Sequence, residues 1–148
     1  MLAMRIRTVI LCVGSALLAS FGASAFEAVT LADYSGEEIF MKYCVACHGE
    51  SGRGDGPVAP GLATMVPDLT AISRRYGEFP TTLVRDTIDG RGARIDAHGT
   101  RTMPVWGYEF WIEEGGDVVA QREMKEVITK LVDYVRSIQD DSAAAKRD

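Results

Sequence analysis

The most reactive side chains of the sequence fall in one pentapeptide, Cys44-Val45-Ala46-Cys47-His48. Two cysteines three positions apart on a helix project from one face, so both sulfurs can reach the vinyl groups along one porphyrin edge. The histidine that follows can turn its imidazole to the iron as an axial ligand. C-x-x-C-H is the attachment signature of a c-type haem. We therefore expect one covalent haem c, with iron, held by Cys44, Cys47 and His48.

Three other interpretations of these cysteines explain less of the sequence. A thioredoxin-like C-x-x-C sits at the start of a helix after a strand, and no strand pattern precedes Cys44. A structural zinc ion needs about four ligands. Beyond the pentapeptide, only His98 is an obvious further nitrogen or sulfur donor. A simple disulfide leaves His48 and the glycine-rich stretch after it without a role.

The second axial ligand of the iron has to come from elsewhere in the chain. The candidates are Met41, Met65, Met103, Met124 and His98. Met41 shares a predicted helix with the cysteines, and Met124 falls in the apolar stripe of the last predicted helix, where packing is the ordinary role of methionine.

Met103 is the favoured second ligand. It lies 55 residues after His48 in a predicted loop and precedes Pro104, a distance that lets the chain pass round the haem edge and return on the other face. His98 is the main alternative, and it would lower the reduction potential relative to methionine. The simplest interpretation of His98 is a histidine on a surface loop.

The first 25 residues resemble a secretory leader rather than part of a fold. Arg5 and Arg7 precede an uncharged run from Thr8, which ends in Ala23-Ser24-Ala25. A basic start, an apolar middle and a small-residue exit are typical of a cleaved signal peptide, and predict a periplasmic protein. The alternative is an uncleaved leader that tethers the protein to a membrane, since 19 uncharged residues are close to the length that spans one.

Composition predicts one small, acidic domain. The chain has 148 residues, with 16 Lys and Arg against 21 Asp and Glu, a formal charge of −5. Removal of the leader and its two arginines leaves 14 against 21, or −7. This charge argues against binding to nucleic acid. It favours redox partner proteins with basic docking patches, whose association depends on salt.

Helical patterns dominate the remaining sequence, and no strand pattern is present. Ser35 and Glu38 form a capping box for a helix from about Gly36 to Ala46. A second helix is predicted over residues 81–88, ending before Asp89-Gly90. Residues 67–70 are expected to start a short helical turn.

The last predicted helix is the clearest element. Asp117 follows Gly115-Gly116 and can cap a helix with an apolar stripe. The stripe consists of Met124, Val127, Ile128, Leu131, Val135 and Ile138. Residues 91–116 contain five glycines and the Met103-Pro104 step, and are predicted to be mostly loop. The predicted organisation is a leader over 1–25, a domain over 26–139 and a flexible tail over 140–148.

Long loops in so short a domain are ordinarily a warning against the assignment, but they are reasonable if a porphyrin fills the core. Leu69, Ile88 and Trp106 are candidates for packing against it, although ordinary core packing demands the same burial. The Trp106 indole N–H could also reach a haem propionate.

Residues 72–101 carry the local excess of positive charge, and one or two of their arginines are candidates for binding a haem propionate. These are Arg74, Arg75, Arg85, Arg91, Arg94 and Arg101.

From about Ser35 to Ile138 the sequence resembles the class I c-type cytochromes of the bacterial periplasm. The motifs that carry the resemblance are Cys44-Val45-Ala46-Cys47-His48-Gly49, Gly52-Arg53-Gly54-Asp55-Gly56-Pro57, Pro67-Asp68-Leu69-Thr70, Met103-Pro104-Val105-Trp106 and Leu131-Val132-Asp133-Tyr134. The resemblance implies an all-α cytochrome c fold, with three main helices and long loops around one haem. The first and last helices would cross through Gly36, Phe40 and Tyr134.

The resemblance also implies roles for single residues. The Met-Pro step at Met103 would supply the axial thioether, whereas Met65 would lie on the proximal side with His48. The carbonyl of the Gly56-Pro57 step would accept the hydrogen of the other ring nitrogen of His48, with Pro60 as an alternative.

The expected function is one-electron transfer between redox partners, a donor dehydrogenase or reductase and an acceptor oxidase or another cytochrome. An iron with both axial positions held by protein leaves no site for a substrate, which favours a carrier over an enzyme. The alternatives are a haem subunit of a larger oxidoreductase and a five-coordinate haem enzyme or gas sensor. Residues 107–116 include Tyr108, Phe110 and Trp111, and could be either a core-filling insertion or a partner contact.

Overall fold

The computed structural model describes residues 29–92 and 103–140, and this part of the chain consists of helices and irregular connections without a strand. The all-α class is therefore confirmed. The predicted leader, His98 and residues 141–148 of the predicted tail lie outside the described residues. The elements in chain order are η1 (Leu31–Asp33), α1 (Gly36–Tyr43), α2 (Val45–His48), η2 (Ala59–Gly61), η3 (Leu69–Ala71), α3 (Ile72–Tyr76), α4 (Thr81–Asp89), α5 (Trp106–Glu113) and α6 (Val118–Ser137).

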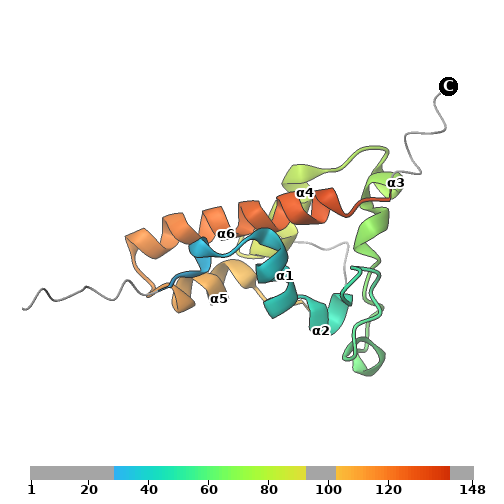
Figure 1. Ribbon diagram of the computed structural model, residues 1–148, viewed down its shortest axis with the longest axis horizontal. Helices are drawn as coiled ribbons and strands as arrows, with labels where there is room; N and C mark the ends of the chain where they lie inside the picture. Colours follow the sequence, from blue (N-terminus) through green and yellow to red (C-terminus); the bar gives the residue numbers. More distant parts are fainter. Residues whose placement is uncertain (1–28, 93–102, 141–148) are drawn as a thin grey trace, which may run out of the picture.

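Helix α6 is the long element against which α1, α4 and α5 pack (Figure 1). It begins as predicted, because the Asp117 carboxylate accepts hydrogen bonds from the backbone N–H groups of Val119 and Ala120, both at 2.8 Å. Such a cap satisfies donors that the first helical turn leaves free. The predicted stripe from Met124 to Val135 is buried. None of the described helices is long and apolar enough to cross a membrane.

Helices α1 and α6 cross through the residues expected from the resemblance. The capping box of Ser35 and Glu38 starts α1. At Gly36 the two backbones approach so closely that a Cβ atom would collide with the Lys130 carbonyl oxygen and would lie 3.0 Å from the Cβ of Tyr134. The Phe40 ring, 1% exposed, lies 5.1 Å from the Tyr134 ring. The crossing therefore depends on a position without a side chain.

The first predicted helix is divided in two at Cys44. Helix α1 ends at Tyr43, and Cys44 has φ −110° and ψ −31° before α2 begins. The Cys44 carbonyl then accepts hydrogen bonds from the N–H groups of both Cys47 and His48, at 3.2 and 2.9 Å. Residues 44–48 thus form a short helical turn with its own direction.

The prediction of mostly loop over residues 91–116 was wrong for α5. Three glycines and a Met-Pro step weaken the local helical pattern there, but burial of aromatic rings outweighs it. Phe110 is completely buried, and its ring stacks on Trp106 at 5.4 Å. The Trp111 indole N–H donates to the Asp117 carbonyl oxygen at 3.0 Å. The aromatic segment is therefore largely core-filling, while Tyr108 remains half exposed.

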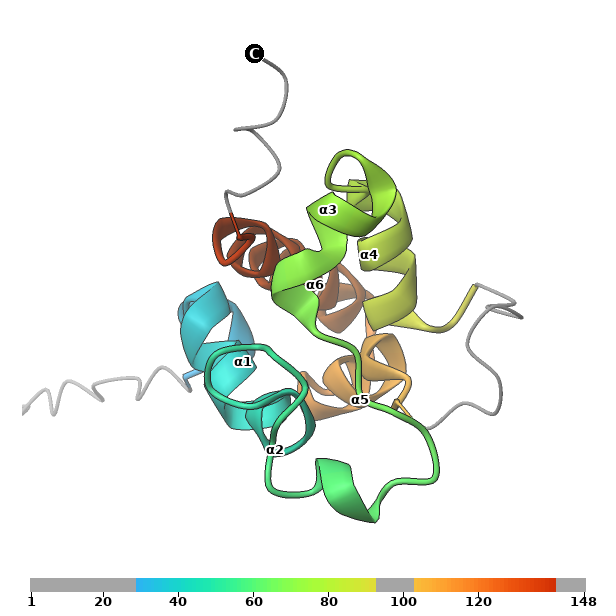
Figure 2. The same ribbon diagram turned by 90° about the vertical axis from the view of Figure 1, so that its right-hand side faces the viewer.

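Helices α3 and α4 lie on the opposite side of the fold from α1 and α2 (Figure 2). Helix α4 extends one residue beyond its prediction, to Asp89, and is capped by Gly90, which has the left-handed conformation with φ 68°. The sequence predicted only a short turn over residues 67–70. In the structure, that turn is η3, capped by Asp68, and it continues directly into α3.

The end of α6 is fixed to η3. The Asp140 N–H donates to the Thr70 carbonyl at 2.9 Å, and the Asp140 carboxylate accepts from Arg53 and from the Thr70 hydroxyl, each at 3.2 Å. The predicted tail begins at this residue, so its first position is held by the folded domain.

The helix crossing leads to a stability prediction. Replacement of Gly36 by alanine should lower the free energy of unfolding by about 2 kcal/mol, because the new methyl group forces α1 away from α6. Thermal unfolding followed by circular dichroism measures the effect. Gly61→Ala is the matched control, since a Cβ at Gly61 meets no atom within 4 Å. Equal melting temperatures for the two variants would contradict the prediction.

Candidate functional site

The short helix α2 is held by the glycine-rich loop that follows it. Backbone N–H groups of Gly54, Gly56 and Val58 donate to the carbonyl oxygens of His48, Cys47 and Ala46, at 2.8, 3.2 and 3.0 Å. These are the carbonyls that the end of a helix leaves without partners. The loop therefore fixes the direction of the turn that carries the two cysteines and the histidine.

The loop can approach α2 so closely because it lacks side chains at the contact. A Cβ atom at Gly56 would lie 2.5 Å from the Ala46 carbonyl oxygen. Gly54 has φ +80°, a conformation that favours glycine, and a Cβ there would collide with the Val66 carbonyl oxygen. The spacing of Gly54 and Gly56 is thus explained by two close backbone contacts of this loop, one with Val66 and one with α2.

An open slot separates the α1–α2 side of the fold from the α3–α4 side. Its empty space is about 870 Å³ when the open solvent at its mouth is counted. Most of the lining is hydrocarbon. The lining residues are Phe40, Cys44, His48, Pro67, Leu69, Ile72, Arg75, Tyr76, Pro80, Leu83, Val84, Thr87, Ile88, Met103, Leu131 and Val135.

The imidazole of His48 is one of the few polar groups on the wall of this slot. Its Nδ1 atom is buried and has no hydrogen-bond partner. Burial lowers the pKa of the imidazole, and the nearby Pro67 backbone acts in the opposite direction. The neutral ring that burial favours is the form that coordinates a metal. A neutral imidazole on the wall of an apolar slot is therefore a candidate metal ligand.

Cys44 and Cys47 are not joined by a disulfide. Burial raises the pKa of the Cys44 thiol to about 12, and the neighbouring Cys47 contributes to the shift. Cys44 lines the slot, whereas Cys47 lies on α2, half-buried and outside the lining. The thiols are therefore placed at one edge of the slot rather than across it.

Of the candidate methionines, Met103 is the one that the structure brings to the slot. Met124 is fully buried within the core, as its place in the apolar stripe predicted. Met65 is 92% exposed and Met41 is 39% exposed. His98, the alternative ligand, lies outside the described residues.

The predicted packing residues divide into two groups. Leu69 and Ile88 line the slot. Trp106 does not, because it packs into an aromatic cluster with Tyr43 and Phe110, at centroid distances of 5.6 and 5.4 Å. Pro57 is exposed in the glycine-rich loop and also lies outside the lining. The backbone that acts on the His48 ring is that of Pro67, not of the Gly56-Pro57 step.

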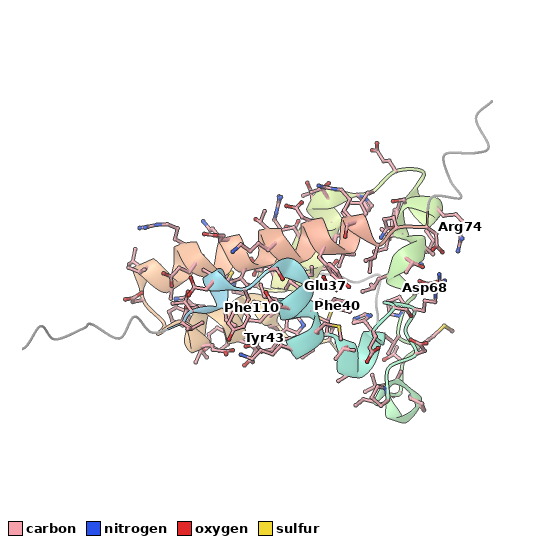
Figure 3. All side chains as sticks on the ribbon, viewed as in Figure 1. Glu37, Phe40, Tyr43, Asp68, Arg74 and Phe110 are labelled. Carbon is pink, nitrogen blue, oxygen red and sulfur yellow. The ribbon has the colours of Figure 1, made fainter. Side chains whose placement is uncertain are left out.

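Among the described arginines that were predicted to lie near the slot, the structure places only Arg75 in its lining. Arg75 lines the slot and donates to the Asp68 carbonyl oxygen at 2.8 Å. Arg74 points away from the fold (Figure 3). Arg85 is exposed on α4, and Arg91 pairs with Asp89 at 2.6 Å. Arg94 and Arg101 lie outside the described residues.

Sequence reasoning missed the part of the slot wall that α3 supplies, and from the α4 part of that wall it identified only Ile88. Ile72 and Tyr76 are four positions apart on α3, and Val84 and Ile88 repeat that spacing on α4. This periodicity was the available signal. On α3 it extends over only one turn, too short to distinguish from loop.

Comparison with known proteins gives one family and several partial relatives. The cytochrome c family profile matches residues 35–139. The cbb3-type cytochrome c oxidase subunit FixP of Azorhizobium caulinodans is 34% identical over 76 residues, 51% of this chain and 24% of that protein. The FixP subunit of Bradyrhizobium diazoefficiens is 32% identical over 71 residues, 48% of this chain and 20% of that protein. The chain thus spans a quarter or less of these relatives, and no solved structure gives a significant match.

The slot leads to a prediction about its occupant. The double variant Cys44→Ser, Cys47→Ser cannot hold a covalently attached group, and should lose at least ~5 kcal/mol of stability, because apolar walls without a filling lose their contacts. That is comparable with the whole stability of a small domain. We therefore expect its cooperative thermal transition, measured by circular dichroism, to disappear. Met65→Ala should retain the transition, and an unchanged transition in the double variant would contradict the prediction.

Proposed function

Because the chain belongs to the cytochrome c family, whose cofactor is a covalently bound haem c, we propose that it is a one-electron carrier with a single haem and with His48 and Met103 as axial ligands. The observation that carries the proposal is the imidazole of His48 on the wall of an apolar slot, with Cys44 beside it and Met103 also in the lining. Within this proposal, Cys44 and Cys47 hold the haem through thioether bonds.

The donor set fits such a group. A neutral imidazole and a thioether are the axial pair that gives cytochromes c a raised potential. The haem supplies an iron that alternates between two oxidation states. The side chains would do the rest: His48 and Met103 would hold the iron, and the hydrocarbon of Leu69, Ile88 and Leu131 would keep water from it.

Two ligands from the protein favour a carrier over an enzyme, because no coordination position is left for a substrate. A five-coordinate haem enzyme or gas sensor would need Met103 away from the iron. We propose that the protein acts in the periplasm after removal of residues 1–25. Its acidic surface then favours redox partners with basic docking patches.

A second candidate function is that of a haem subunit in a larger oxidoreductase. The relatives that are named as subunits of a cbb3-type oxidase favour it. Tyr108 and Ile112, both on α5 and each 50% exposed, could form part of a permanent contact. The chemistry of the haem is the same in both proposals, and only the permanence of the association differs.

The axial ligands are tested by comparing matched methionine variants of protein matured with haem. We expect Met103→Ala to lose the thioether–iron charge-transfer band at the red end of the spectrum and to lower the reduction potential. Met65→Ala should keep both, since Met65 is 92% exposed. Retention of the band in Met103→Ala would refute this ligand. Absence of covalent haem in the wild type would refute the function as a whole.

Carrier and subunit are distinguished by how the protein associates. For a carrier, the second-order rate of electron transfer to a basic redox partner should fall steeply as the salt concentration rises from 10 to 500 mM, because screening weakens attraction to the acidic surface. Size-exclusion chromatography of gently solubilised native membranes is the complementary measurement. Co-elution with an oxidase at high salt would favour the subunit.

A further inference from the structure

The segment that carries Met103 lies between the end of α4 and the first turn of α5. Arg91 follows α4 by two residues, and Gly107 is the second residue of α5, four positions after Met103. Side-chain contacts join these two points and also tie them to α6.

Arg91 is the centre of these contacts. Its Nε and Nη2 atoms donate to the two carboxylate oxygens of Asp89, at 2.6 and 3.0 Å. Its Nη1 donates to the Gln121 side-chain oxygen at 3.0 Å, and Nη2 lies 3.6 Å from the Met124 sulfur. Gln121 and Met124 belong to α6, so the guanidinium connects the end of α4 to the central helix. Forked geometry of this kind is specific to arginine.

Gly107 brings α5 against the same pair. A Cβ atom at this position would lie 2.7 Å from the Arg91 Nε atom and would collide with the Asp89 carboxylate. Gly107 is itself buried. The first turn of α5 therefore packs directly on the ion pair, which a larger residue at 107 would prevent. We name Asp89, Arg91, Gly107 and Gln121 together the arginine clamp.

The position of α5 determines that of Met103. Only three residues, Pro104, Val105 and Trp106, separate Met103 from Gly107, and the proline ring restricts the backbone between them. Trp106 is further fixed by stacking on Phe110. A displacement of the first turn of α5 is thus transmitted to Met103 over a short, stiff connection.

We propose that the arginine clamp positions Met103 as axial ligand, so that Arg91 sets how readily the thioether leaves the iron. This inference rests on the proposed His48 and Met103 ligation. Arg91 is a positioning residue, because its contacts are with Asp89, Gln121 and Met124 and it does not line the slot.

The test compares Arg91→Gln with Arg85→Gln, an exposed arginine on α4. The readout is the rate at which excess imidazole displaces the thioether in the ferric, haem-loaded protein, followed by loss of the charge-transfer band. We expect Arg91→Gln to raise this rate about tenfold, equivalent to ~1.4 kcal/mol, and Arg85→Gln to leave it unchanged. A purely structural role would lower the melting temperature without changing this rate.

A milder variant covers the case in which Arg91→Gln fails to fold. Gln121→Met keeps the side-chain length but removes the acceptor for Nη1, and we expect a severalfold faster displacement. Wild-type rates in folded Arg91→Gln or in Gln121→Met would overturn the inference and leave the proposed ligation intact. A wild-type protein without the charge-transfer band would overturn both.

Discussion

A slot lined with hydrocarbon runs between the two sides of a small helical domain. The other features of the fold follow from the need to keep this slot open and to place His48, Cys44 and Met103 on its walls. Helices α1, α4 and α5 pack on α6 and leave the slot open between the α1–α2 side and the α3–α4 side. Helix α6 supplies the continuous core, through seven buried residues along its length. The short helices α2 and α3 have few contacts of their own. They depend on capping loops and on the haem that we propose lies between them.

Polar interactions are placed where they hold the walls of the slot without entering it. Arg53 joins the glycine-rich loop to the end of α6 through Asp140, and the arginine clamp joins α4, α5 and α6. The side chains in both sets of contacts are partly exposed, so their charges retain some hydration and avoid the full cost of burial. The lining of the slot, by contrast, is mostly hydrocarbon and includes the imidazole of His48. The charged groups thus pair with one another outside the slot, whose walls carry the side chains of His48, Cys44 and Met103.

The sequence predicted the parts of the fold that local patterns specify. The caps at Ser35 and Asp117, the stripe of α6 and the extent of α4 are all present. Prediction failed at α5, where glycines weakened the helical signal and buried aromatic rings restored it. For the site, covalent motifs indicated Cys44, Cys47 and His48, and chain distance indicated Met103. The placement of Trp106, Pro57 and Arg75 depends on which elements face each other, information that no local pattern contains.

The glycine-rich loop has a consequence for the order in which the protein folds. Its hydrogen bonds to α2 join residues about ten positions apart, whereas the crossing of α1 with α6 joins Gly36 to Lys130 and Tyr134. Closure of a long loop costs more entropy than closure of a short one, and non-local contacts form slowly for that reason. The turn that presents both thiols and the imidazole can therefore organise from nearby sequence alone. The crossing, which needs almost the whole domain, can follow as the step that encloses it.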